Sequence, residues 1–158
     1  MRLMIKQRVF SWTDSYDIYD ENGDARYYVK AELFSFGHQI HVYEKDGGRE
    51  VGSVHQKLLT FMPAFEIVIK GQTLGTVRKE FTFFHPRYYV DFCGWDVEGD
   101  IFGWDYEVQR NGVPVMSVYK EFFAWGDTYC LDIQNPADEM MALLLVIAID
   151  AANCSHDD

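Results

Sequence analysis

The stretch NPADEMMALLLVIAIDAANC, Asn135–Cys154, decides the fold, because ten consecutive apolar residues, Met140–Ile149, lie at its centre. Asn135 is a favourable helix N-cap and Pro136 suits the first helical position. The two carboxylates that follow fall in the first turn, where the positive end of the helix dipole favours them. The stretch is therefore predicted to be a helix that has no polar face.

A helix of this kind must be enclosed. A membrane span needs about 20 apolar residues, so a run of ten indicates a buried core helix. A helix that is apolar on all sides must also be covered on all sides. We therefore expect the rest of the chain to form a wall around it. The opening MRLMIKQRVF has no apolar signal-peptide stretch.

An internal repeat encodes this wall. The segments EVGSVHQKLLTFMPAFEIVI (50–69), TLGTVRKEFTFFHPRYYVDF (73–92) and PVMSVYKEFFAWGDTYCLDI (114–133) align without gaps, and three further segments fit the same template. Successive first-strand anchors are 24, 25, 23, 20 and 21 residues apart; they are Ile5, Val29, Val54, Val77, Val97 and Val118. Such a period indicates a repeated supersecondary unit.

Each unit is predicted to be a β-hairpin. Apolar residues alternate on both sides of a tip, and the turn signals ENGD, KDGG, KGQ and RNG separate the units. Six hairpins give twelve strands. About eight strands close a barrel that side chains alone can fill, so twelve leave room for a helix. Glycines on the inward face, Gly52 and Gly75, would let the helix approach closely.

The predicted fold is mainly β: a closed twelve-stranded antiparallel barrel enclosing a C-terminal hydrophobic helix. The 158 residues suit one domain, with the hairpins in residues 1–134 and the helix in 135–154. The alternative is a two-layer sandwich with the helix at one edge, which would leave part of the helix in water.

Composition restricts the function. The net charge of −11 opposes binding to nucleic acid and non-specific attraction to anionic membranes. Three scattered cysteines form neither a disulfide framework nor a zinc site, which predicts a reduced, cytoplasmic protein.

Motifs for catalysis or cofactor binding are absent from the sequence, which has no Gly-x-Ser-x-Gly elbow, phosphate loop, dinucleotide fingerprint or His-Glu-x-x-His. The segment DENGD at Asp20 is expected to be a hairpin turn instead of a calcium loop, because its Gly is fourth and not sixth. The acidic residues Asp96, Glu98 and Asp100 alternate as on one solvated strand face. No cofactor, metal site or enzymatic activity is predicted.

One column of the repeat is unusual. The residue two positions after each anchor shares the inward face with it; these residues are Gln7, Ala31, Gln56, Lys79, Gly99 and Lys120. Polar groups on that face need partners or access to water. The structural interpretation is that they reach the barrel rim or pair with helix-end groups such as Asp150. The functional interpretation is a polar rim, with Lys79, Lys120 and Gln56, that binds an anionic head group.

Five segments carry a family resemblance: VFSWTDSYDIYDENG (9–23), KEFTFF (79–84), WDVEGD (95–100), GDTY (126–129) and DEMMALLLVIAID (138–150). They resemble the LURP-one-related proteins of the tubby-like superfamily, which includes tubby C-terminal domains and phospholipid scramblases. The resemblance covers nearly the whole chain. It implies a closed twelve-stranded barrel around a C-terminal helix.

The resemblance also guides the functional hypotheses. Tubby domains bind phosphoinositides through basic residues, whose positions find no match here. We expect a non-enzymatic domain that binds a phospholipid head group or a protein partner. Scramblase-like lipid handling is an alternative, although the lipidated cysteine segments of scramblases are not found in this sequence. An enzyme with an unrecognised site is a further alternative.

Overall fold

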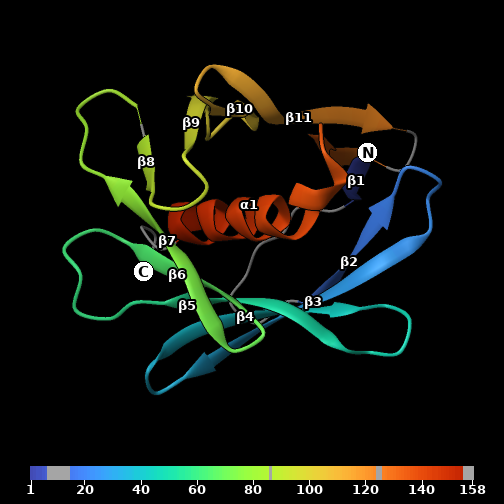
Figure 1. The fold of residues 1–158 in the computed structure, drawn as a ribbon, viewed down its shortest axis with the longest axis horizontal. Coiled ribbons are helices and arrows are strands. Elements are labelled where there is room, and N and C mark those ends of the chain that lie inside the picture. Colours follow the sequence, from blue (N-terminus) through green and yellow to red (C-terminus); the bar gives the residue numbers. More distant parts are fainter. Residues whose placement is uncertain (7–14, 86, 124–125, 155–158) are drawn as a thin grey trace.

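The computed structural model describes residues 1–6, 15–85, 87–123 and 126–154, and these contain twelve strands and one α-helix (Figure 1). The strands are β1 (Arg2–Ile5), β2 (Ser15–Asp20), β3 (Ala25–Phe34), β4 (Gly37–Glu44), β5 (Glu50–Gln56), β6 (Ala64–Ile69), β7 (Gln72–Glu80), β8 (Arg87–Val90), β9 (Trp95–Asp100), β10 (Asp105–Arg110), β11 (Val113–Phe123) and β12 (Gly126–Ile133). The chain ends in a short 3-10 helix, η1 (Pro136–Asp138), followed by α1 (Glu139–Cys154).

All twelve strands belong to one antiparallel sheet, in the order β8-β7-β6-β5-β4-β3-β2-β1-β12-β11-β10-β9. The sheet curls around α1, which confirms the predicted barrel and excludes the sandwich (Figure 1). The two end strands, β8 and β9, lie against each other without a hydrogen-bonded ladder between their described residues. The barrel is therefore nearly closed, with a seam at this position.

The turns form where the sequence predicts them. In DENGD, the Asp20 side chain accepts hydrogen bonds from the backbone N–H groups of Asn22 and Asp24, and Gly23 has a φ of 86°. This is a hairpin turn, as expected. In RNG, both Asn111 and Gly112 have positive φ, which the tightest hairpin turns require.

The helical segment begins after Asn135, as predicted, but its first turn is a 3-10 helix. The Asn135 side chain accepts a hydrogen bond of 3.0 Å from the Ala137 N–H, and the first turn is η1 before α1 starts at Glu139. The Glu139 carboxylate accepts hydrogen bonds from the Arg26 guanidinium and the Tyr27 hydroxyl. These contacts attach the beginning of α1 to the beginning of β3.

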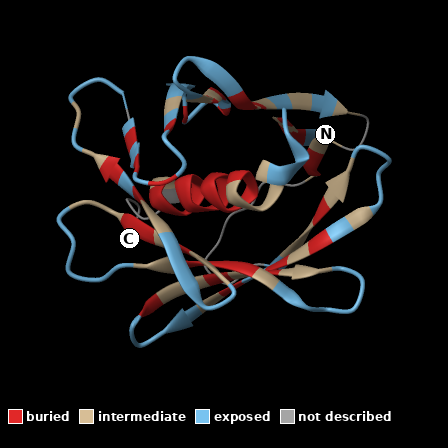
Figure 2. Cartoon of the chain, in the orientation of Figure 1, coloured by how far each residue is buried: buried red, intermediate tan, exposed pale blue. Residues whose placement is uncertain are grey.

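The barrel encloses the helix completely over three turns. Every residue from Ala142 to Ala152 is buried, as the red helix in Figure 2 shows. Gly52 permits close approach, because a Cβ there would lie 2.7 Å from Leu144 Cδ1. The expectation for Gly75 is wrong: a Cβ there would overlap the ring of Phe92. This glycine makes room for an aromatic side chain of the wall, not for the helix.

In the part of the chain that the structure describes, no helix is both long enough and apolar enough to span a membrane.

Candidate functional site at the hairpin tips

Three neighbouring hairpin tips form the candidate site. We call them the apical loops: residues 33–37, which include the end of β3 and the start of β4, residues 58–63 between β5 and β6, and residues 81–85 between β7 and β8. Each follows an odd-numbered strand, and the odd-numbered strands of this antiparallel sheet all run in the same direction. The loops therefore emerge at one end of the barrel, the end toward which the C-terminus of α1 points (Figure 1).

Direct contacts connect the apical loops. The Leu58 side chain packs over Gly37, and the Gln56 side chain accepts a hydrogen bond of 3.0 Å from the His38 N–H. The Lys79 N–H donates to the Pro63 carbonyl at 2.9 Å. The three tips are thus neighbours along the sheet.

The surface of the apical loops is apolar and exposed. Nine large apolar side chains are exposed on it: Leu33, Phe34, Phe36, Leu58, Leu59, Phe61, Phe81, Phe83 and Phe84. Phe61, Phe83 and Phe84 are 93%, 85% and 89% exposed, so they protrude into solvent. The apical loops contain no Asp, Glu, Lys or Arg, although these residues make up 25% of the chain. An apolar patch of this kind is typical of an interaction site.

Charges of both signs border the apical loops. Lys57 immediately precedes Leu58, and Arg87 begins β8; both are exposed. Among the described residues, neither has a carboxylate within 4 Å of its cationic group. Two acidic residues also border the loops. Glu80 is the cross-strand neighbour of Arg87, and Glu32 pairs with Lys30 at 2.9 Å.

The structure places Lys79, Gln56 and Lys120 on the inner face of the barrel, in agreement with the alternation. Their cross-strand neighbours are the buried residues Tyr88, Phe65 and Tyr129, respectively. All three lie near the apical end of their strands. Gln7, in the same column, lies outside the described residues.

These three side chains do not converge on one pocket. Lys79 is only 5% exposed, and its ammonium lies 5.4 Å from the ring centre of Phe102. Lys120 is at the rim, where its ammonium lies 3.9 Å from the Asp127 carboxylate. Gln56 is engaged by His38, as described above. The arrangement favours structural roles, and the head-group role of these residues stays a prediction.

Buried polar groups also surround the C-terminal end of α1. Asp150 and Lys79 are the two buried charged side chains among the described residues. The Tyr88 hydroxyl donates a hydrogen bond to the Asn153 side chain. Burial, and then the charge of Asp150, raise the pKa of Tyr106 well above its ordinary value. Tyr106 therefore stays neutral.

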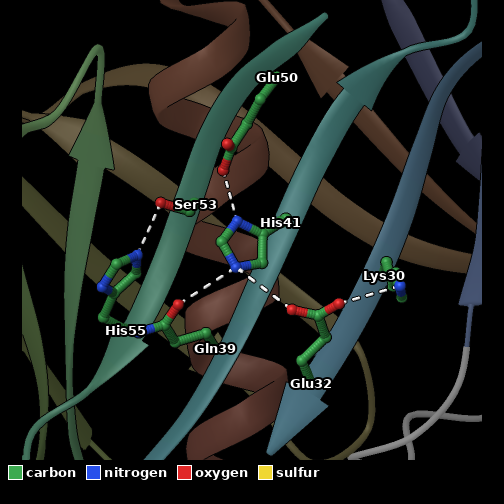
Figure 3. A network of polar contacts seen from close by, with 7 residues as sticks. All are labelled: Lys30, Glu32, Gln39, His41, Glu50, Ser53 and His55. Carbon is green, nitrogen blue, oxygen red and sulfur yellow. Dashed lines mark hydrogen bonds and ion pairs between the residues drawn. The ribbon is translucent and has the colours of Figure 1, made fainter. Parts of the chain in front are cut away.

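A second polar cluster lies on the outer wall of β3, β4 and β5 (Figure 3). His41 bridges Glu50 and Gln39, and its ring centre lies 6.0 Å from that of His55. Ser53 Oγ and His55 Nε2 are hydrogen-bonded at 2.8 Å. Burial, and then the neighbouring His41, lower the pKa of His55.

This cluster has the residue types of a serine–histidine nucleophile but not its accessibility. Ser53 lines a pocket together with His41, Glu50 and His55, but it is only 4% exposed, so its hydroxyl is poorly accessible to a substrate carbonyl. No group of three or more metal-binding side chains is found among the described residues. The strand register, which sets His41 opposite Ser53, brings the two histidines together.

The site and the fold together define a class: a twelve-stranded, helix-filled barrel domain whose apical loops are apolar and contain no charged residue. The family profile of the LURP-one-related proteins matches residues 1–150, and the chain belongs to this family.

Two known proteins are similar to it. The uncharacterized protein YxjI of Bacillus subtilis is 29% identical over 158 residues, which are 100% of this chain and 97% of that protein. An X-ray structure of an Arabidopsis thaliana protein has a TM-score of 0.64 at 16% identity and covers 95% of this chain and 90% of that one, which shows the shared fold.

Proposed function

We propose that this protein is a non-enzymatic, tubby-like domain that binds a phospholipid surface through its apical loops. The observation that carries the proposal is the charge-free apolar surface of nine exposed side chains. Such patches bind either proteins or lipid interfaces. The free thiols of Cys93 and Cys130 support a cytoplasmic location within this proposal.

The shape of the surface favours lipid over protein. Phe61, Phe83 and Phe84 protrude from two separate loops. A protein interface needs a rigid complementary surface at its core, whereas fluid lipid closes around protruding side chains of any arrangement. Aromatic side chains are also favoured at membrane–water interfaces.

The test is flotation of the full chain with phosphatidylcholine vesicles, comparing wild type with the double variant Phe83→Ser/Phe84→Ser. Burial of one phenylalanine stabilises by about 1.5–3 kcal/mol, so loss of two should weaken binding by more than about ten-fold. Val113→Ser is the matched control, because Val113 is 64% exposed and begins β11, outside the apical loops.

The proposal predicts that wild type and Val113→Ser bind equally, while the double variant stays folded and is lost from the vesicles. Wild-type protein that fails to float, or a double variant that floats as well as wild type, would overturn it. Movement of a fluorescent lipid between leaflets, measured on the same vesicles, would support the scramblase-like alternative.

A further inference from the structure

We infer that Lys57 and Arg87 contact the phosphate layer of the bound membrane, and that this membrane is an electrically neutral phospholipid bilayer. This inference rests on the proposed function and assigns residues and a lipid class to it. In this inference the apical loops insert their apolar side chains into the membrane, and Lys57 and Arg87, instead of the inward-facing Lys79 and Lys120, contact the head groups.

The two cations are placed for this contact. Lys57 lies two residues before Leu59, and Arg87 lies three residues after Phe84. A strand advances about 3.3 Å per residue, so each cation lies within about 10 Å of a protruding apolar side chain. Interfacial segments bury their apolar face by about 5–10 Å, which brings such flanking side chains to the level of the phosphates.

The two cations are also available. Both side chains are exposed, and no described carboxylate lies within 4 Å of either. Lys120, by comparison, is occupied by Asp127. An arginine guanidinium binds phosphate oxygens in a bidentate manner, and a lysine ammonium binds them as a flexible point charge.

The charge pattern favours a neutral membrane. Recognition of anionic leaflets uses clusters of about four to eight basic residues, whereas two border the apical loops here. Glu80 is the cross-strand neighbour of Arg87, and the whole chain carries −11. A strongly anionic surface would repel this protein. A zwitterionic head group offers phosphate to the cations and ammonium to the carboxylates.

The experiment compares two neutral vesicles: phosphatidylcholine, which has phosphate, and a galactolipid, which has none. Wild type is measured beside Lys57→Gln/Arg87→Gln and beside a control at the opposite end, Arg49→Gln/Lys70→Gln. We expect the first double variant to bind phosphatidylcholine about five-fold more weakly than wild type. We expect equal binding of all three proteins to galactolipid and unchanged binding of the control to both.

Each other outcome has a defined meaning. Wild type that binds both vesicles with no effect of Lys57→Gln/Arg87→Gln overturns the phosphate contact and leaves the proposed function standing. An equal loss on both vesicles also overturns it, since the effect would not require phosphate. Tighter binding to vesicles containing phosphatidylserine, weakened by salt, overturns the neutral membrane. No binding to any vesicle overturns both proposals.

Discussion

A single methyl group at Gly52 should destabilise the protein, because the helix approaches β5 closely at this point. A Cβ at position 52 would lie 2.7 Å from Leu144 Cδ1 and 3.3 Å from its Cδ2. Carbon atoms normally touch at about 3.5–4.0 Å, so the Leu144 side chain must move by about 1 Å. It is fully buried in a helix that is covered on all sides. We therefore expect Gly52→Ala to cost about 1–3 kcal/mol.

A double-mutant cycle tests this reason. Leu144→Ala alone should cost about 2–5 kcal/mol, because it leaves a cavity. The new methyl group at position 52 then has space, so the double variant should be more stable than the sum of the two losses by about 1 kcal/mol. Leu131→Ala is the control partner. Leu131 is fully buried but lies on β12, five strands away from β5. Its effect should add to that of Gly52→Ala within about 0.5 kcal/mol.

The assay is urea unfolding followed by tryptophan fluorescence, with thermal unfolding as a second measure. A loss of 1 kcal/mol lowers the melting temperature of a domain of this size by roughly 2–4 °C. If Gly52→Ala is neutral, or if its effect simply adds to that of Leu144→Ala, the close approach of helix and strand is refuted.

Three more predictions concern the charges and the helix. Lys79 and Asp150 are the two buried charged side chains among the described residues, and we expect them to compensate each other. Lys79→Met or Asp150→Asn alone should then each destabilise by about 3–5 kcal/mol, and the double variant by less. Additive losses in urea unfolding would argue against this coupling. For Asp132, burial opposes ionisation, but hydrogen bonds from Arg2 and Tyr119 outweigh it and lower the pKa. Since the folded-state pKa is depressed, the ionised Asp132 carboxylate stabilises the fold at neutral pH, and this contribution is lost as the pH falls through that pKa. Asp132→Asn should therefore lose less stability than wild type below about pH 4. An unchanged dependence of the unfolding free energy on pH would contradict this. A chain ending at Asn135 should aggregate, because the apolar barrel lining would be exposed; a soluble, cooperatively unfolding monomer on gel filtration would show that the helix is an appendage.

The sequence predicted most of the fold because its signals are local. Alternation of apolar residues defines each strand, turn residues such as Asn111 and Gly112 define where a hairpin reverses, and the period reveals that the unit repeats. The apolar run at 140–149 then requires a wall on all sides. Fold class, strand number and the position of the helix follow from these features without any knowledge of long-range contacts.

The remaining features depend on which residues the register sets side by side. Gly75 faces inward as predicted, yet the side chain that fills its space comes from Phe92, beyond the end of the neighbouring strand β8. The seam between β8 and β9 and the proximity of His41 to His55 also follow from pairing and not from composition. The sequence indicates where the apical loops lie, but only the structure shows that their apolar side chains are exposed and not part of the core.

The apical phenylalanines are apolar residues that the fold does not explain. The barrel lining and α1 are buried, and their apolar character stabilises the folded state. Phe61, Phe83 and Phe84 remain in solvent, so a polar residue at these positions would serve folding equally well. Their substitution by serine should therefore leave the unfolding midpoint within about 0.5 kcal/mol of wild type while it abolishes membrane binding. Loss of stability together with binding would instead show that these side chains support the loops.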